Sequence, residues 1–310
     1  MICVDINGGL GNQMFQYATA YAMAKSRDDR LLLDVSHMDS EYQKSENITL
    51  REYQLGNFRI SAELADLKLS ITDNKLRKLI NRYFKFYQLG GIATVLSTKF
   101  VHDRDCYSYL PEQFPKNKNM YLCGFFQSWK YFDTYQDELL REFTVKDEIL
   151  SADAKSMIMK CKNTKSVGVH IRRGDYLNCP DWLIHERFFV EAIDRIKEEI
   201  GQDISLYVFC NEIGFAEKLF ADLRDVVFVT AENKYSDLEE FCILSACCNQ
   251  IISNSSFSWW AAYLNDTPSK TIIAPEYSHW SRAYYPDNWI TLKAQSAKIE
   301  CIENEKGEKA

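Results

Sequence analysis

Apolar residues along this chain alternate between short continuous runs and stretches with helical spacing. Ile2 to Ile6 is an apolar run, and the glycine-rich segment Asn7 to Asn12 follows it. Apolar and aromatic residues then recur at helical spacing from Gln13 to about Lys25, and Leu31 to Val35 is a second apolar run. This order predicts a strand, a loop, a helix and a second strand.

The rest of the first half has a less regular pattern. Residues 62–87 are predicted to be mainly helical, and residues 98–135 are aromatic-rich and irregular, with Tyr121 to Phe126 as the best strand candidate. The segment Asp137 to Thr164 is predicted to be helical and polar. A chain of 310 residues exceeds what one hydrophobic core usually holds. We therefore place a domain junction in that segment, and predict an N-terminal domain of residues 1–155 and a C-terminal domain of residues 156–310 that ends in a polar tail.

The second half has a regular alternation of elements. The predicted strands are Ser166 to Ile171, Ile204 to Cys210, Val226 to Val229, Gln250 to Ser253 and Thr271 to Ala274, and the predicted helices are residues 187–200, 212–222, 237–248 and 257–265. Such alternation is typical of a parallel sheet with helices on both faces. Ligands of such sheets lie at the carboxyl ends of the strands.

The composition narrows the class of protein. The net charge of −7 argues against binding along nucleic acid, because no excess of basic residues covers a surface. The ten cysteines include no C-x-x-C pair, which is typical of buried thiols in a reduced, cytoplasmic protein. The chain opens on a predicted strand without a basic, then apolar, leader, and no apolar run approaches the roughly 18 residues needed to span a bilayer.

The motif His170-Ile171-Arg172-Arg173-Gly174-Asp175 ends the first strand of the second half. Two adjacent guanidinium groups at the mouth of a buried strand are costly unless an anion meets them. In an alternating strand His170 and Arg172 point to one side and Arg173 to the other, so that one arginine can face a ligand while the other braces the scaffold. A diphosphate suits the planar fork of arginine. The alternative is a plain ion pair of Arg173 with Asp175.

A second polar segment, Asn254-Ser255-Ser256, closes another strand and opens a helix. Ser255 or Ser256 is a natural N-cap, and the start of that helix offers backbone N–H groups to an anion. Together with the arginine pair it predicts a diphosphate site built without metal. The pair Asp103 and Asp105 has the spacing of a manganese motif, but its irregular polar surroundings favour a solvated loop.

The glycine loop Gly8-Gly9-Leu10-Gly11-Asn12-Gln13-Met14 suggests a competing reading. It lies between a strand and a helix, and Asp34 ends the next strand, as in nicotinamide dinucleotide sites. Met14 replaces the third glycine of that fingerprint and would hinder close helix packing. The amides of Asn12 and Gln13 suit sugar hydroxyls or phosphate, while a further alternative is that the glycines only form a tight turn.

Three motifs in register add a family resemblance: GGLGNQMFQYA near the start, GVHIRRGDY in the middle and SNSSFSWWAAYLN late in the chain. They resemble the bacterial alpha-1,2-fucosyltransferases of glycosyltransferase family 11. The resemblance runs over about residues 1–290, with GFFQSWKYF and YVFCNE as further support. It implies an α/β fold of glycosyltransferase-B type, with two facing Rossmann-like domains of parallel sheets.

The resemblance also implies an activity. The enzyme would move L-fucose from GDP-fucose, with inversion, to the 2-hydroxyl of a terminal galactose on a glycan acceptor such as a surface polysaccharide precursor. The N-terminal domain would bind the acceptor and the C-terminal domain the donor. No cofactor or metal is expected, and membrane association would be peripheral at most.

Site residues carry over by position. The resemblance implies that Arg172 binds the diphosphate and stabilises departing GDP, that His170 and Arg173 lie at the nucleotide, and that Ser256, with Ser255, contacts phosphate. Further implied residues are Asp237 or Glu240, which would read guanine, and Asn12, which would project toward sugar or phosphate with Gly11 and Gln13 in the same donor-binding loop.

Two points stay open at this stage. Asp175 is a candidate general base, but a carboxylate so close to two arginines more often orients a guanidinium, and we favour that bracing role. Asn211-Glu212 departs from the paired acids of relatives, which weakens any role for Asn211. A non-catalytic carbohydrate-binding protein is the alternative outside enzymes, since several aromatic residues could stack on sugars: Trp129, Trp259, Trp280 and Tyr284.

Overall fold

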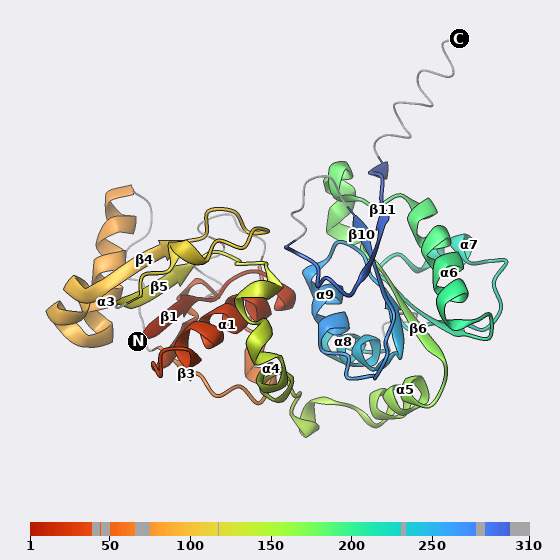
Figure 1. Ribbon diagram of the computed structural model, residues 1–310, viewed down its shortest axis with the longest axis horizontal. Coiled ribbons are helices and arrows are strands. Elements are labelled where there is room, and N and C mark those ends of the chain that lie inside the picture. The colour runs from red at the N-terminus through yellow and green to blue at the C-terminus, as the bar shows by residue number, and fades with distance from the viewer. Residues whose placement is uncertain are drawn as a thin grey trace, which may run out of the picture. The chain divides into compact units, whose positions relative to one another are not determined.

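The structure, a computed structural model, describes residues 1–38, 44, 50–65, 75–116, 118–230, 234–276 and 283–297, with the backbone alone for residues 75–83 and 86. The chain forms two compact units. The first comprises Met1–Lys146 with residues 283–285, and the second begins at Asp147 and includes the other described residues. Figure 1 shows that each unit has its own sheet and its own helices.

The first unit is built on a parallel sheet of five strands. In chain order they are β1 (Ile2–Asp5), β2 (Leu31–Asp34), β3 (Glu63–Leu64), β4 (Thr98–His102) and β5 (Asn119–Cys123), and their spatial order is β3-β2-β1-β5-β4. Among the described residues, the helices with defined bounds are α1 (Leu10–Lys25), α3 (Lys75–Ser97) and α4 (Gln136–Glu142). The order reverses between β1 and β5, and open α/β sheets bind their ligands at the carboxyl ends of the strands at such a point.

The predicted start of the chain is confirmed, with differences at the ends of elements. Helix α1 begins at Leu10, earlier than the expected Gln13, because Gly9 acts as its N-cap and the glycine loop already provides the first turn. Residues 63–64 form strand β3 rather than helix, residues 66–74 lie outside the described part, and α3 continues to Ser97 across non-helical Gly90 and Gly91. Strand β4 was not predicted, because its half-exposed pattern lacks a continuous apolar run.

The second unit is a parallel sheet of six strands. They are β6 (Ser166–Ile171), β7 (Ser205–Cys210), β8 (Val226–Phe228), β9 (Asn249–Ile251), β10 (Ile272–Glu276) and β11 (Ile290–Lys293), in the order β11-β10-β9-β6-β7-β8. Figure 1 shows α6 (Glu186–Ile200) and α7 (Ile213–Leu219) on one face and α8 (Asp237–Ala246) and α9 (Ser256–Tyr263) on the other. The five predicted strands and four predicted helices of this half are confirmed, whereas edge strand β11 was missed because its residues alternate between half-buried and exposed.

The division between the units differs from the predicted boundary. It falls between Lys146 and Asp147, within the segment where the junction was expected but ahead of residues 155 and 156. A boundary at 155 would cut α5 (Ala152–Lys162), which packs against α8. The Glu239 side chain of α8 also accepts a hydrogen bond of 2.9 Å from the Ser151 backbone N–H at the start of α5.

The buried core of the second unit explains why strands and helices alternate so regularly along its sequence. All six residues of β6 are buried, as expected for a strand covered on both faces. Its apolar side chains pack with those of α6, including Phe189 and Ile193. Trp259 and Trp260 of α9 are fully buried and belong to this core. The nine cysteines among the described residues are unpaired thiols, and no helix in the described part of the chain is long and apolar enough to cross a membrane.

Candidate functional site

The strand order of the second unit brings two of the predicted motifs together. Strand β6 pairs with β7 on one side and with β9 on the other, and the strand order reverses between β6 and β9. His170, Arg172 and Arg173 lie at the carboxyl end of β6, and Asn254 to Ser256 follow β9. The two segments therefore flank the point where open α/β sheets bind their ligands.

His170 links these two segments directly. Its Nδ1 lies 2.9 Å from Ser253 Oγ, and its ring lies 5.5 Å from that of Phe257 in α9. Burial, and secondarily the charge of Arg172, lowers the pKa of His170 to about 3. The imidazole is therefore neutral at neutral pH. It holds the two strand ends together and brings no positive charge to an anion.

Arg172 is held by two neighbours in its own loop. Its Nη2 lies 2.7 Å from Asp175 Oδ1, and its guanidinium lies over the Tyr176 ring at 5.6 Å from the centroid. Burial raises the pKa of Tyr176 to about 12, so this ring stays a neutral phenol. The Arg172 side chain remains 29% exposed. It is thus both oriented and accessible to a ligand.

Arg173 is turned toward β7. Its Nε lies 2.6 Å from Glu212 Oε2, its guanidinium lies 3.8 Å from the centroid of the Phe215 ring, and its backbone N–H donates to Asn211 Oδ1 at 3.2 Å. The alternative pair of Arg173 with Asp175 is wrong, because Asp175 pairs with Arg172. The predicted division of tasks between the arginines fits these different partners.

The need for a glycine at position 174 of the motif is steric. Gly174 has φ +31°, and a Cβ placed on it would lie 2.0 Å from Asn211 Nδ2. A larger residue would displace the amide that holds the Arg173 backbone. Asn211 and Glu212 are therefore part of the site as supports. The sequence offered no basis for this role, because the residues that Asn211 and Glu212 support lie at the end of another strand.

The helix start after β9 is capped as predicted, and the cap is Ser255. Its hydroxyl oxygen accepts a hydrogen bond from the Phe257 N–H at 3.3 Å, and the residue is buried. Ser256 is the first helical residue and is half-buried, so it is the more accessible of the two hydroxyls. The Asn254 amide donates to the Trp182 carbonyl at 2.7 Å and so fixes the loop that follows the arginine motif.

Helix α8 carries the two acidic candidates for guanine. Asp237 at its first position is exposed, whereas Glu240 one turn later is half-buried. Burial, followed by the charge of Asp237, raises the pKa of Glu240 to about 7. Helix α8 approaches the arginine motif through Phe241, whose ring lies 5.3 Å from that of Phe257. Glu240 is therefore more buried than Asp237 and has a raised pKa, and both properties are common among carboxylates in binding sites.

The glycine loop of the first unit is held from within that unit. Asn12 is half-buried, and its Oδ1 accepts a hydrogen bond of 2.8 Å from Gln127 in the loop after β5. Gln13 is fully buried, and its Nε2 donates to the carbonyls of Gly8 and Glu52 while its Oε1 accepts from the Gln54 N–H. The assignment of Gln13 to donor binding is therefore wrong: its amide ties the loop to a neighbouring segment. Gly11 is likewise buried in the first turn of α1.

Other residues singled out in the sequence have structural roles. The Asp103 Oδ2 accepts from the Phe126 N–H at 2.7 Å, and the Asp105 Oδ2 accepts from the Ser108 hydroxyl at 2.7 Å. Trp259 and Tyr284 are buried and offer no face to a sugar, and Trp280 lies outside the described residues. The indole of Trp182 is instead 52% exposed and packs edge-on against Tyr176.

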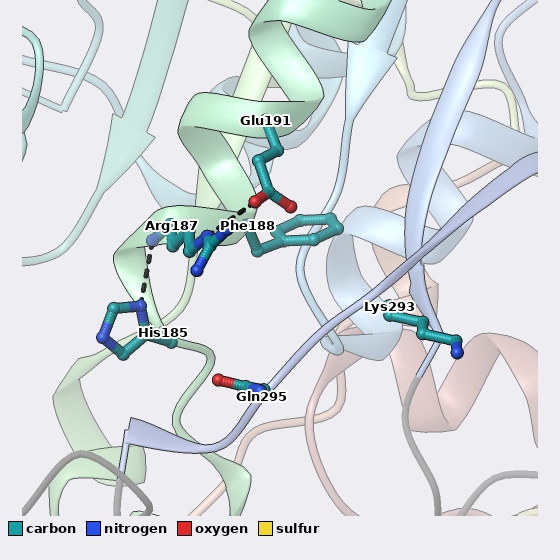
Figure 2. A pocket seen from close by; sticks show the side chains of 6 residues that line it. All are labelled: His185, Arg187, Phe188, Glu191, Lys293 and Gln295. Atoms are coloured by element: carbon teal, nitrogen blue, oxygen red, sulfur yellow. Dashed lines mark hydrogen bonds and ion pairs between the residues drawn. The ribbon is translucent and has the colours of Figure 1, made fainter. Parts of the chain in front are cut away.

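A shallow pocket of about 230 Å³ lies elsewhere in the second unit (Figure 2). It lies between the start of α6 and the end of β11, and Figure 2 shows Arg187 linked to His185 and Glu191. Lys293 and Gln295 close its other side. None of the predicted donor-binding residues lines it, so we do not assign the donor to this pocket.

Comparison with known proteins identifies the family. The family described as Glycosyl transferase family 11 matches residues 1–293. The chain belongs to glycosyltransferase family 11. This family 11 member is 30% identical to the O-antigen biosynthesis glycosyltransferase WbnK of Escherichia coli, over 93% of this chain and 99% of the relative. It is also 30% identical to an alpha-1,2-colitosyltransferase of Escherichia coli, over 89% and 91% of the two chains. A galactoside alpha-(1,2)-fucosyltransferase 2 of Oryctolagus cuniculus is 25% identical, over 96% of this chain and 78% of the relative.

Solved structures place the family 11 chain in a known fold. The fucosyltransferase NodZ from Bradyrhizobium matches with a TM-score of 0.51 and 13% identity, over 88% of this chain and 94% of that one. A variant of FUT1 of Arabidopsis thaliana in complex with GDP matches with a TM-score of 0.52 and 12% identity, over 95% and 73%. The predicted family and the predicted α/β fold with two parallel sheets are confirmed.

Proposed function

We propose that this glycosyltransferase moves L-fucose from GDP-fucose to the 2-hydroxyl of a terminal galactose on a surface glycan precursor. One observation supports it most strongly: an accessible, oriented Arg172 and the capped start of α9 flank the switch point of the second sheet. An arginine fork and helix N–H groups suit a diphosphate. The names of the relatives, which include galactoside alpha-(1,2)-fucosyltransferases, support the sugar and the linkage.

The proposed reaction is a displacement at the anomeric carbon of fucose. The oxygen of the acceptor hydroxyl forms the new bond to that carbon from one face, while the bond to the phosphate oxygen breaks on the other. The electron pair of the broken bond leaves with GDP, and the hydroxyl proton passes to a base or to water. Because negative charge grows on the phosphate, a fixed Arg172 stabilises the transition state more than the ground state.

Asp175 has a specific part in this proposal. Its carboxylate is 2.7 Å from the Arg172 guanidinium, which is the geometry of a group that orients the arginine. Accepting a proton from the acceptor hydroxyl would cancel the charge that holds Arg172 in place. We therefore assign Asp175 as the brace of Arg172 and leave the base to another group or to solvent.

Glu240 is proposed as the carboxylate that reads the guanine edge. We predict that GDP affinity falls as the pH is lowered through about 7, since protonated Glu240 loses the charge that accepts two guanine N–H groups. Glu240→Gln should weaken GDP binding at alkaline pH by about tenfold or more, the value of a hydrogen bond to a charged group, and reduce the pH dependence to that of the terminal phosphate of GDP. Isothermal titration with GDP across the pH range measures both effects.

Asp237→Asn is the matched control for that experiment. Asp237 is one turn earlier on the same helix but exposed, so its variant should keep GDP affinity near that of the unaltered protein. A pH-independent GDP affinity in the unaltered protein, or a larger loss in Asp237→Asn than in Glu240→Gln, would contradict the assignment.

Metal independence is a further part of the proposal. In this proposal, Arg172 and the start of α9 balance the negative charge of the diphosphate. Among the described residues, no group of three His, Cys, Asp or Glu side chains has the arrangement of a metal site. Transfer activity should therefore persist when EDTA is added, measured as GDP released with donor and acceptor present. An activity that disappears with EDTA and returns with manganese would overturn this part.

A second donor is supported by one of the relatives. The alpha-1,2-colitosyltransferase is as similar to this chain as WbnK is, at 30% identity. Colitose lacks the 3-hydroxyl of fucose, so the two GDP-sugars share the diphosphate and guanine contacts proposed here. A transfer assay with both donors against a panel of galactosides, with the product linkage determined by NMR, tests donor and acceptor together. GDP binding without transfer to any galactoside would favour the carbohydrate-binding alternative, and NADH binding without GDP binding would favour the dinucleotide alternative.

A further inference from the structure

Helix α3 of the first unit has one face packed on the sheet. Leu89 and Val95 contact the small core cluster that includes Leu32 and Tyr121. Lys85, one turn before Leu89, is buried, and its Nζ lies 2.6 Å from Asp34 Oδ2 at the end of β2. Lys85, Leu89 and Val95 therefore mark the side of α3 that faces the sheet. Figure 1 shows α3 beside β4 in the first unit.

Large apolar side chains are exposed on both helical parts of α3, before and after the break at Gly90 and Gly91. Phe84 and Tyr87 are 40% and 54% exposed, and beyond the kink at Gly90 and Gly91 the side chains of Ile92 and Leu96 are 69% and 81% exposed. Leu96 and Ile92 lie one turn apart and share a side of the helix. Burial of an Ile or Leu side chain is worth about 1.5–3 kcal/mol, so four large apolar side chains exposed within 13 residues indicate a surface that a partner covers. We call these four side chains the α3 patch.

The segment around the α3 patch is strongly basic, although the chain is acidic overall. Residues 74–102 contain no Asp or Glu, and the net charge of the whole chain is −7. The basic residues of this segment are Lys75, Arg77, Lys78, Arg82, Lys85 and Lys99. Of these, Lys85 is buried and pairs with Asp34. A basic amphipathic helix with aromatic and aliphatic side chains on one face is the pattern of helices that lie in a membrane interface.

Two kinds of partner could cover such a patch, and the charge distinguishes them. A second copy of the chain would pair the patch with itself about a twofold axis and bring the two basic segments together. A bilayer that contains anionic lipids offers the opposite charge over a wide surface and an apolar layer just below it. We infer that α3 docks the protein on an anionic membrane surface, with the α3 patch inserted at the level of the headgroups.

Flotation with lipid vesicles tests this inference. The unaltered protein should bind vesicles of phosphatidylcholine containing roughly one third phosphatidylglycerol, and bind vesicles of phosphatidylcholine alone at least about tenfold more weakly. Raised salt should weaken the binding. The double variant Ile92→Asp with Leu96→Asp should lose about tenfold or more of the vesicle binding, since two charges would enter the interface.

Matched controls separate the patch from exposed apolar residues in general. Met159 on α5 and Val190 on α6 are 56% and 44% exposed in the second unit, and Met159→Asp with Val190→Asp should leave vesicle binding unchanged. Circular dichroism and thermal unfolding check that both double variants are folded. The measurement needs no donor or acceptor, so its result is independent of the proposed transfer reaction.

Three outcomes would overturn the inference. The first is a failure of the unaltered protein to float with anionic vesicles. The second is an equal loss of binding in the control variant. The third is a dimer, detected by light scattering, that dissociates in the Ile92→Asp with Leu96→Asp variant, which would assign the α3 patch to an interface between two copies.

Discussion

Arg172→Ala is expected to lower kcat for glycosyl transfer by about a hundredfold or more, because removing one fixed donor to a developing oxyanion costs roughly 3 kcal/mol in barrier height. The Arg172 guanidinium is oriented by Asp175 and Tyr176 and is still accessible. The variant deletes a partly exposed side chain rather than a core group, so the fold should be retained. Turnover with saturating donor and acceptor measures the effect, and circular dichroism checks the fold.

Arg172→Lys and Arg187→Ala sharpen this experiment. Lysine keeps the charge but not the planar fork, so Arg172→Lys should recover only part of the lost activity. Arg187 is also an arginine with an acidic partner in the second unit, but its side chain is 77% exposed and pairs with Glu191 on the surface of α6. Arg187→Ala should have nearly unaltered kcat. Normal turnover of a folded Arg172→Ala protein would remove the central element of the proposed mechanism.

Lys85→Met is expected to destabilise the protein by about 3–5 kcal/mol, the typical cost of breaking a buried ion pair. Lys85 and Asp34 are both buried, and the Tyr121 hydroxyl donates to the same carboxylate. Burial by itself would raise the pKa of Asp34, but the Lys85 charge and the hydrogen bonds from Lys85, Ser36 and Tyr121 outweigh it and lower that pKa. Urea unfolding of the variant gives the change in free energy.

The double variant Asp34→Asn with Lys85→Met distinguishes an ion pair from simple packing. Removing both charges should recover much of the lost stability, since no uncompensated charge is left buried. Lys162→Met is the surface control, because Lys162 and Asp266 form an exposed pair at 3.6 Å, and its effect should stay within about 1 kcal/mol. A loss below that value for Lys85→Met would show that the buried pair contributes little.

The pH dependence of these variants follows from the sign of the Asp34 shift. A carboxyl whose pKa is lowered by folding adds stability that is present above its unfolded pKa and is lost as the pH falls through its folded pKa. Without Lys85, burial raises the pKa of Asp34 instead, so the charged form becomes unfavourable in the folded state. The penalty of Lys85→Met should therefore be smaller in acid than at neutral pH.

The pattern of the sequence predicted the second unit better than the first. Strand β6 is a continuous apolar run because both of its faces are covered, and such runs stand out without knowledge of their neighbours. Strands β4 and β11 are partly exposed, so their sequences lack the continuous apolar run that predicts a buried strand. The helix predicted over residues 62–87 was wrong at its start, where residues 63–64 form strand β3, whereas its end lies near the break at non-helical Gly90 and Gly91.

The sequence by itself determined the family, the alternation of elements in the second unit and the different directions of Arg172 and Arg173. These features depend on local order: motifs in register, apolar runs, and the opposite directions of neighbouring side chains in a strand. The N-cap of α9 could also be predicted, because a serine that follows a strand and precedes an apolar helix accepts a hydrogen bond from a backbone N–H of that helix.

Only the tertiary structure decided which partner each polar group has. Arg173 pairs with Glu212, 39 positions later, because β6 and β7 lie side by side in parallel register. The Gln13 amide forms hydrogen bonds with the backbone of Glu52 and Gln54, and Asp34 pairs with Lys85. No local pattern in the sequence indicates these contacts. A buried polar group must find its partner among all segments that the fold brings near it, so its role follows from the packing of distant elements.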